Sequence, residues 1–251
     1  MWIQAFMVMA LTICFCLNSS PLRAGTPRSD RLAVQAGVKT DVAKDMSQAA
    51  RPREITTSRT CLDGRPAKNF EGDIIEYWAN LECPYCGIQE PAKAQRENPA
   101  ICIVVRHIPA ANLGESMKKA LAYEALRSFS VNSANRFWDA VIPKTALTIP
   151  MPYEAALHAA LDDAAIAPGA FGDALRRASE LVSADILEAQ GRVSTTPTYV
   201  IQGIRFPACD FTAMELPQAI SLAKRARAGE SSARQEIIEM ITRGKMDEKL
   251  L

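Results

Sequence analysis

Short apolar runs rich in β-branched residues alternate along this chain with longer segments in which apolar residues recur at helical spacing. Strands are expected at residues 55–61, 73–78, 101–108 and 198–201. The run at 101–108 is apolar almost throughout, which is typical of a strand covered on both faces. Gln202-Gly203 is a turn signal, so residues 204–206 are expected to return as a short hairpin strand.

A long Ala- and Leu-rich block separates the third expected strand from the fourth. Its helical periodicity predicts helices at residues 115–128, 133–142, 153–163, 170–180 and 184–191. We interpret residues 110–192 as a helical insertion that packs on the sheet as a unit. A closing helix is expected at 216–228, and the tail at 229–251 is interpreted as a solvated terminal helix, with a docking segment as the alternative.

The first 24 residues predict a secretory signal peptide. Residues 2–17 are apolar but too short for a comfortable membrane span, and a polar stretch ending in Ala24 follows them. An uncleaved membrane anchor is the alternative. Residues 25–54 are polar and are interpreted as a linker or a loosely attached helix.

The charge balance limits the classes of partner. Of the 29 Lys and Arg residues only Arg23 lies in the leader, so the remainder carries 28 bases against 28 acids. A neutral balance argues against nucleic acid as the main partner and gives no reason to expect binding to an anionic membrane surface.

The motif Cys83-Pro84-Tyr85-Cys86 is the main candidate for chemistry. It follows the strand expected at 73–78 and precedes a polar stretch at 87–97 that predicts a helix. Cys83 would then lie at a helix N-terminus, where the peptide dipole and free N–H groups favour a thiolate, the attacking species in disulfide exchange. Cys86, one turn later, is placed to close a disulfide, and Pro84 suits the first turn because its missing N–H has no cost there.

Two other interpretations of the motif remain. Half of a zinc site would need a second cysteine pair or histidines at ligand spacing, but the other cysteines are isolated and His107 and His158 are far apart in sequence. A purely structural disulfide is the second. The position between a strand and a helix favours redox chemistry, with no metal and no organic cofactor.

The remaining cysteines of the exported chain are Cys61, Cys102 and Cys209. Disulfides persist in an oxidising compartment, and with the motif the total is five, so one thiol is left over in a monomer. Cys102 lies inside an apolar run and is expected to be an inert core thiol. Cys61 and Cys209 lie outside such runs and can pair with each other or with a partner chain.

Thr196-Pro197 stands immediately before the last long strand. A proline there lacks a hydrogen-bond donor for the sheet, and we expect a cis bond. The backbone of Thr196 would then be free to pair with an extended peptide.

With these residues in view, the chain resembles the DsbA-like family of exported thiol–disulfide oxidoreductases in the thioredoxin superfamily. The resemblance covers residues 55–228 and rests on Glu76-Tyr77 before Cys83-Pro84-Tyr85-Cys86-Gly87, on Val104-Val105-Arg106-His107-Ile108-Pro109, and on Val193-Ser194-Thr195-Thr196-Pro197-Thr198-Tyr199-Val200-Ile201-Gln202-Gly203. It implies an α/β thioredoxin fold with a helical insertion between the third strand and the cis-proline strand.

The resemblance also implies roles. Cys83 would be the nucleophile and Cys86 its partner, Pro84, Tyr85 and the strand acid Glu76 would tune them, and Thr196 and Pro197 would bind substrate. The implied partners are cysteine-containing exported proteins and a DsbB- or DsbD-type membrane redox partner. Glu76 lies one residue further from the first cysteine than the strand acid of the family, and an edge-facing glutamate is the alternative.

The direction of electron flow stays open between oxidase, isomerase and reductase. Tyr85 replaces the histidine of the best-known DsbA dipeptide, and the Pro-Tyr dipeptide and Thr196 resemble DsbG-like and ScsC-like relatives. Residues 25–55 are too few and too polar for the N-terminal dimerisation domain of DsbC- and DsbG-type isomerases. A competing hypothesis is a non-catalytic thioredoxin-like chaperone or assembly factor of a secretion or conjugation apparatus, with the motif as an anchoring disulfide.

Overall fold

The computed structural model describes residue 39 and residues 41–45, 59–89, 91–110, 115–144, 148–207 and 215–244. The predicted signal peptide at 1–24, most of the linker at 25–54, Cys209 and the end of the tail at 245–251 lie outside the described residues. Within the described ranges, no helix combines the length and the apolar character that crossing a membrane requires.

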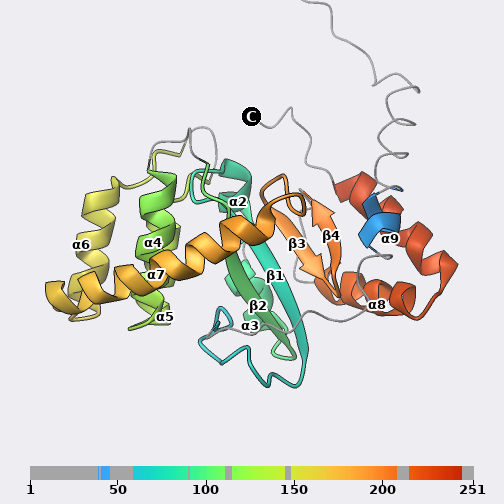
Figure 1. The fold of residues 1–251 in the computed structure, drawn as a ribbon, viewed down its shortest axis with the longest axis horizontal. Coiled ribbons are helices and arrows are strands. Elements are labelled where there is room, and N and C mark those ends of the chain that lie inside the picture. The colour runs from blue at the N-terminus through green and yellow to red at the C-terminus, as the bar shows by residue number, and fades with distance from the viewer. Residues whose placement is uncertain are drawn as a thin grey trace, which may run out of the picture.

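A four-stranded sheet forms the centre of the fold (Figure 1). Its strands are β1 (Asp73–Ala79), β2 (Ile101–His107), β3 (Thr198–Ile201) and β4 (Ile204–Pro207), in the order β2-β1-β3-β4. The strand β2 runs parallel to β1, whereas β3 is antiparallel to both β1 and β4. These four strands confirm the sequence predictions, including the hairpin at Gln202 and Gly203.

The strand expected at 55–61 is not borne out in its described part. Thr60 makes only an isolated bridge to Pro66, and the amide of Cys61 donates to the carbonyl of Arg65. Residues 61–65 therefore form a turn, because Gly64 adopts a positive φ of 89° that reverses the chain.

The side chains of β1 alternate between two apolar clusters. Ile75, Tyr77 and Ala79 point into the main core, whereas Trp78 packs on the other face with Val200 and with the end of the longest helix. The strand β2 is buried at all seven positions, as expected for a strand covered on both faces. Helices must therefore cover both sides of the sheet.

Four helices form the block between β2 and β3. They are α4 (Ser116–Arg127), α5 (Val131–Val141), α6 (Tyr153–Asp163) and α7 (Pro168–Ala189). The helix α5 begins after Ser130, whose Oγ accepts a hydrogen bond from the amide of Ser133 at 3.1 Å. This block matches the predicted insertion, with one correction: the helices expected at 170–180 and 184–191 are the single helix α7, because no proline interrupts the chain after Pro168.

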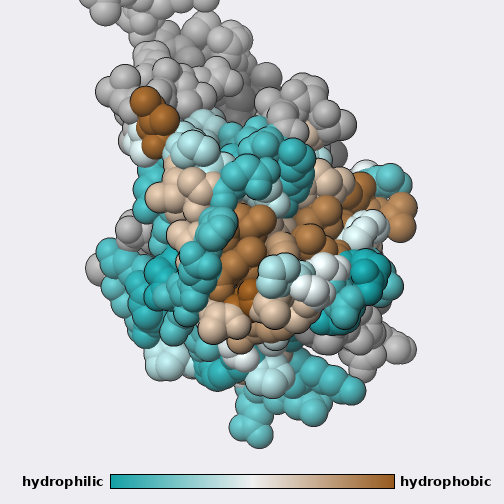
Figure 2. Space-filling view, turned by 90° about the vertical axis from the view of Figure 1, so that its left-hand side faces the viewer, coloured by the Kyte–Doolittle hydropathy of each residue, from teal (hydrophilic) through white to brown (hydrophobic). Residues whose placement is uncertain are grey.

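The helix α7 crosses the front of α4 and ends beside β2, so it joins the helical layer to the sheet (Figure 1). On the outer side of the helical layer, apolar residues gather at the centre of a face that is framed by polar ones (Figure 2). Partly buried Leu157 and Leu161 of α6 and Leu175 of α7 pack against the main core.

Outside this block the structure describes the helices α2 (Pro84–Ile88), α3 (Pro91–Glu97), α8 (Glu215–Arg227) and α9 (Ser231–Gly244), and residues 41–45 are helical as well. The helix α9 packs on α8, and Ala233, Ile237, Met240 and Ile241 are buried in the main core. The interpretation of the tail as a solvated helix is therefore wrong, because the apolar positions of its amphipathic pattern all lie on one face that α8 covers.

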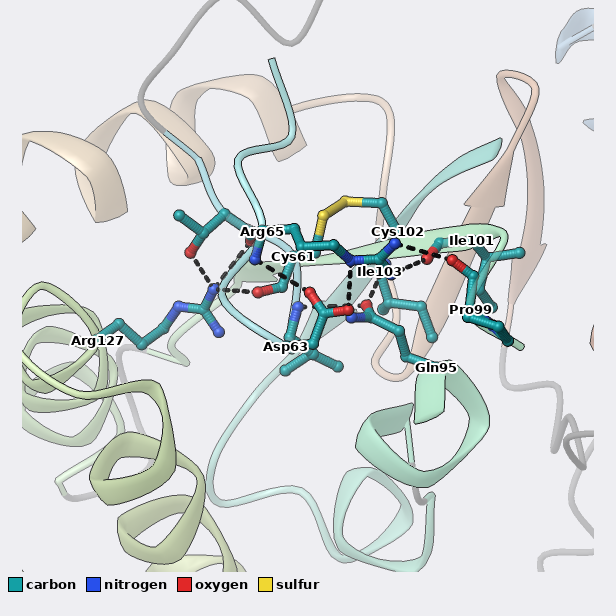
Figure 3. The surroundings of a disulfide bond; sticks show 11 residues. Cys61, Asp63, Arg65, Gln95, Pro99, Ile101, Cys102, Ile103 and Arg127 are labelled. Atoms are coloured by element: carbon teal, nitrogen blue, oxygen red, sulfur yellow. Dashed lines mark hydrogen bonds and ion pairs between the residues drawn. A yellow bond between two sulfur atoms is a disulfide. The ribbon is translucent and has the colours of Figure 1, made fainter. Parts of the chain in front are cut away.

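A disulfide joins Cys61 to Cys102, with 5.0 Å between the two Cα atoms (Figure 3). The expectation of an inert thiol at Cys102 is wrong, and Cys61 pairs with neither of the two partners left open by the sequence, Cys209 or a partner chain. The apolar run around Cys102 does not indicate a disulfide partner. Cys61 lies 41 residues away in sequence, and the two cysteines meet only when the entry segment folds against β2. Both cysteines are fully buried beside Ala67 and Val104.

Hydrogen bonds hold the segment around Cys61 on both sides of the disulfide (Figure 3). Arg65 donates to the carbonyls of Pro99 and Ile101, and Arg127 of α4 donates to the carbonyl of Cys61. The buried Gln95 accepts from the amide of Ile103 at 2.6 Å and from the amide of Leu62 at 3.3 Å. The disulfide therefore joins the entry segment to β2, α3 and α4.

We expect loss of this disulfide to destabilise the fold. The bond closes a loop with a sequence separation of 41, for which chain entropy gives about 3–4 kcal/mol. Urea unfolding should be compared in a background in which Cys83 and Cys86 are alanine, with and without Cys61→Ala and Cys102→Ala. Equal urea midpoints in the two proteins would contradict a stabilising role.

Candidate active site

The turn from β1 into α2 places the two cysteines of the motif at different depths. Cys83 precedes α2 with extended backbone angles, its amide donates to the carbonyl of Asn80 at 3.0 Å, and its own carbonyl accepts from the amide of Cys86 at 3.0 Å. Pro84 occupies the first turn, as expected. Cys83 is half-buried, whereas Cys86 is completely buried, and both thiols are free.

The segment before β3 comes to the same place. The Sγ of Cys83 lies 3.3 Å from the carbonyl oxygen of Thr196, to which the thiol donates when it is protonated. The Thr196–Pro197 bond is cis, which confirms the sequence prediction. Thr196 is half-buried and Pro197 is buried. The fold therefore brings together the cysteine pair and the proline loop, which are more than a hundred residues apart in sequence.

The surroundings separate the acidities of the two thiols. The pKa of Cys83 falls from an ordinary value of 9.0 to about 6, mainly because the thiol of Cys86 donates to its sulfur. Burial opposes this shift, while a hydrogen bond from the side chain of Thr196 and the backbone N–H groups of Cys86 and Tyr85 add to it. Burial, followed by the bond to Cys83, raises the pKa of Cys86 well above 9.0. The half-buried sulfur therefore carries the negative charge at neutral pH, and the deeper one keeps its proton.

Two polar residues outside the motif attach the site to α4. The side-chain oxygen of Asn80 accepts from the hydroxyl of Ser116 at 2.7 Å and from the amide of Glu82 at 2.9 Å. Lys119 of α4 pairs with Glu82 at 3.0 Å and donates to the carbonyl of Val141. The sequence motif gives no signal for Asn80 or Lys119, because their roles depend on how α4 packs.

A close backbone contact attaches α2 to the end of α5. A Cβ atom at Gly87 would lie 1.9 Å from the carbonyl oxygen of Pro143, so only glycine fits there. The residue that follows the motif thus allows the helical insertion to pack directly on the active-site helix.

The structure does not bring Glu76 to the cysteines. Its carboxylate accepts from Nε1 of Trp78 at 2.8 Å and lies 3.9 Å from Arg192, on the face of the sheet opposite Cys86. The expectation that Glu76 tunes the cysteine pair is therefore wrong. Successive side chains along a strand point to opposite faces of the sheet, so Tyr77, the next residue, points toward Cys86.

Tyr77 is the residue of β1 that contacts Cys86, the cysteine whose thiol is buried. Its hydroxyl donates to the carbonyl of Cys86 at 3.3 Å, and its ring lies 4.8 Å from that of Tyr199. Tyr199 in turn donates to Oε1 of Gln89 at 3.3 Å. Burial, and then the charge of Cys86, raise the pKa of Tyr77 well above 10.0, so its hydroxyl stays protonated and remains a donor.

The other predicted groups can be placed as well. Tyr85 is half-buried and contributes its backbone N–H to the sulfur of Cys83. Within the described ranges, no group of three or more His, Cys, Asp and Glu side chains is arranged to hold a metal. His107 instead bonds to Glu124, and His158 to Asp162. In this part of the chain the zinc interpretation thus lacks the further ligands that it requires.

We expect the alkylation of reduced protein to report the low pKa of Cys83. The thiolate is the reactive form, so the rate with iodoacetamide should rise as the pH increases through about 6 and level off above it. Cys83→Ser should remove this fast phase, because the pKa of Cys86 is raised. A midpoint near the ordinary thiol value of about 8.5 would contradict the lowered pKa.

Comparison with known proteins supports the fold. No protein-family model and no curated protein matches the sequence. The thiol-disulfide exchange protein alpha-DsbA2 of Wolbachia pipientis matches with a TM-score of 0.50 and 14% identity, over 75% of this chain and 97% of that chain. A doubly substituted alpha-DsbA1 of the same organism matches with a TM-score of 0.50 and 12% identity, over 74% and 97%. ScsC of Proteus mirabilis matches with a TM-score of 0.47 and 15% identity, over 80% and 88%. The chain has the DsbA-like thioredoxin fold, with α4–α7 as its helical insertion.

Proposed function

We propose that this protein is an exported thiol–disulfide oxidoreductase that exchanges disulfides with cysteine-containing exported proteins through Cys83 and Cys86. One observation carries the proposal. The half-buried sulfur of Cys83 lies 3.3 Å from the carbonyl oxygen of Thr196 and accepts a hydrogen bond from the buried thiol of Cys86, which lowers the pKa of Cys83 to about 6, while burial keeps Cys86 protonated. A purely structural cysteine pair does not require two thiols whose pKa values differ in this way.

In the oxidising direction, a substrate thiolate attacks the sulfur of Cys83 in the Cys83–Cys86 disulfide. The bond between the two cysteines breaks, and Cys86 leaves with the electron pair and takes up a proton. The second substrate thiol, deprotonated, then attacks the substrate sulfur of the mixed disulfide, and Cys83 leaves as a thiolate. Counted from its two thiols, the substrate loses two electrons, which reduce the Cys83–Cys86 pair, and two protons, of which one is taken up by Cys86 and the other is released to water because Cys83 leaves as a thiolate. The reverse sequence reduces a substrate disulfide.

The surroundings of Cys83 stabilise it as the leaving group. A thiolate with a lowered pKa leaves more readily, and its stabilisation favours the reduced form of the pair. In the proposal, Pro84 and Tyr85 set this stabilisation through the geometry of the first turn of α2. Thr196 and Pro197 position an extended substrate segment beside the sulfur, by backbone pairing with Thr196.

Export to the periplasm is part of the proposal. The buried Cys61–Cys102 disulfide supports it, because such bonds persist in oxidising compartments, and the predicted signal peptide at 1–24 agrees with it. Each turnover leaves the cysteine pair in the opposite redox state. A membrane redox partner of the DsbB or DsbD type would restore it.

The competing hypothesis of a non-catalytic assembly factor loses one of its supports. It relied on the C-terminal tail as a docking segment, but Ala233 and Ile237 of α9 are completely buried against the rest of the fold. A lack of activity in thiol–disulfide exchange assays would still favour this non-catalytic hypothesis.

Insulin reduction and peptide oxidation test the proposal directly. We expect the wild-type protein to catalyse at least one of the two reactions and Cys83→Ser to catalyse neither. Cys86→Ser should accumulate a mixed disulfide with a substrate cysteine, because the resolving thiol is missing. A folded wild-type protein inactive in both assays would overturn the proposal and favour the non-catalytic alternative.

The reduction potential of the Cys83–Cys86 pair decides the direction. Equilibration with glutathione gives this value. A potential near about −120 mV identifies an oxidase, and one near about −270 mV identifies a reductase.

A further inference from the structure

Cys86 is the leaving group of the proposed exchange, and it is buried. When a thiolate attacks Cys83, the electron pair of the broken disulfide passes to the sulfur of Cys86, which has an exposed fraction of 0% and packs in the main core. A buried negative charge is costly unless hydrogen-bond donors face it. The backbone of Asn80 and the side chain of Thr196 favour this thiolate, but burial outweighs them and keeps the pKa of Cys86 raised. A further donor would therefore make Cys86 a better leaving group.

Tyr77 brings such a donor to Cys86 from β1. Its hydroxyl donates to the carbonyl oxygen of Cys86 at 3.3 Å, and a hydrogen bond between this hydroxyl and the Cys86 side chain contributes to the raised pKa of Tyr77. The single proton of the hydroxyl thus has two acceptors within reach, the carbonyl oxygen and the sulfur. Charge-assisted hydrogen bonds are stronger than neutral ones, so the proton should turn to the sulfur once the sulfur becomes a thiolate.

Packing fixes the ring of Tyr77 in this position. The side chain is completely buried, and its ring lies 4.8 Å from that of Tyr199 in β3 and 6.3 Å from that of Trp138 in α5. The bond to the carbonyl has a structural explanation, because α2 ends at Ile88 and carbonyls in the last turn of a helix lack intrahelical partners. The contact with the sulfur has no such explanation and indicates a chemical role.

We propose that Tyr77 is a catalytic residue whose hydroxyl donates a hydrogen bond to the sulfur of Cys86 as the Cys83–Cys86 bond breaks. The proposal rests on the thiol–disulfide exchange proposed above. The attacking thiolate forms a bond to the sulfur of Cys83, and Cys86 leaves with the electron pair. Tyr77 keeps its proton and shares it with the new thiolate, and the proton that Cys86 later takes up comes from water. In the reverse direction the same bond stabilises the Cys86 thiolate that attacks the mixed disulfide.

Reduction of the Cys83–Cys86 disulfide by dithiothreitol isolates this step, because a small thiol does not depend on a site for protein substrates. In the full chain, Tyr77→Phe should slow the reduction about tenfold or more, as expected for the loss of a hydrogen bond to a charged group. Alkylation of Cys83 by iodoacetamide in the reduced protein does not require Cys86 to leave. Its rate, measured where Cys83 is fully ionised, should be unchanged, whereas a displaced α2 would alter both rates.

Tyr199→Phe is the matched control. Tyr199 is also buried and packs on the ring of Tyr77, but its hydroxyl donates to Oε1 of Gln89, the residue that ends α2, at the same distance of 3.3 Å. The control therefore removes a buried hydroxyl bond at the end of the same helix and leaves the hydroxyl of Tyr77 in place. We expect its disulfide to be reduced at the wild-type rate. The proposal is overturned if Tyr77→Phe is reduced at that rate, or if both substitutions slow the reduction equally.

The test separates this proposal from the proposed function. Because no protein substrate is used, a slow Tyr77→Phe variant of a protein inactive toward insulin and peptides would support the role of Tyr77 and overturn only the exchange with proteins. If Tyr77→Phe does not fold, 3-fluorotyrosine at position 77 tests the same bond. Its more acidic hydroxyl is a stronger donor and should speed the reduction, and an unchanged rate would contradict the proposal.

Discussion

The antiparallel pairing of β1 with β3 is the constraint on which the rest of the molecule depends. In this register Trp78 lies opposite Thr198, so the end of one strand, where the cysteine motif begins, meets the start of the other. This register places the carbonyl of Thr196 beside Cys83. All of the chain between β2 and β3 must be folded away without disturbing this pairing, and α4–α7 accomplish that by packing as one layer against the sheet.

A cluster of buried charges holds that layer in place. Asp185 of α7 pairs with Arg59 at 2.7 Å and with Arg106 of β2 at 3.1 Å, and it accepts from the amide of His107 at 3.0 Å. A buried ion pair adds little net stability over apolar packing, but a misplaced partner leaves an uncompensated charge. Such a cluster therefore specifies how α7 crosses the sheet more than it strengthens the crossing.

The sequence was sufficient for features that depend on local patterns. Strand and helix periodicity predicted the four strands and the insertion, and the motif with Thr196-Pro197 predicted which segments meet. Three features depend on distant contacts that no local pattern carries: the partner of Cys102, the burial of α9 against α8, and the union of two predicted segments in α7. Glu76 is a different case, since alternation along β1 would have assigned the inward position to Tyr77 once the face of Cys86 was known.

The contact between Gly87 and Pro143 has a mechanical consequence. With no room for even one carbon atom between the active-site helix and the end of α5, α2 cannot tilt or shift toward the helical layer. Any movement of α2 that accompanies a change of redox state must therefore either preserve this contact or open it by moving α2 away from α5. The contact thus makes the end of α5 a stop for the active-site helix in one direction.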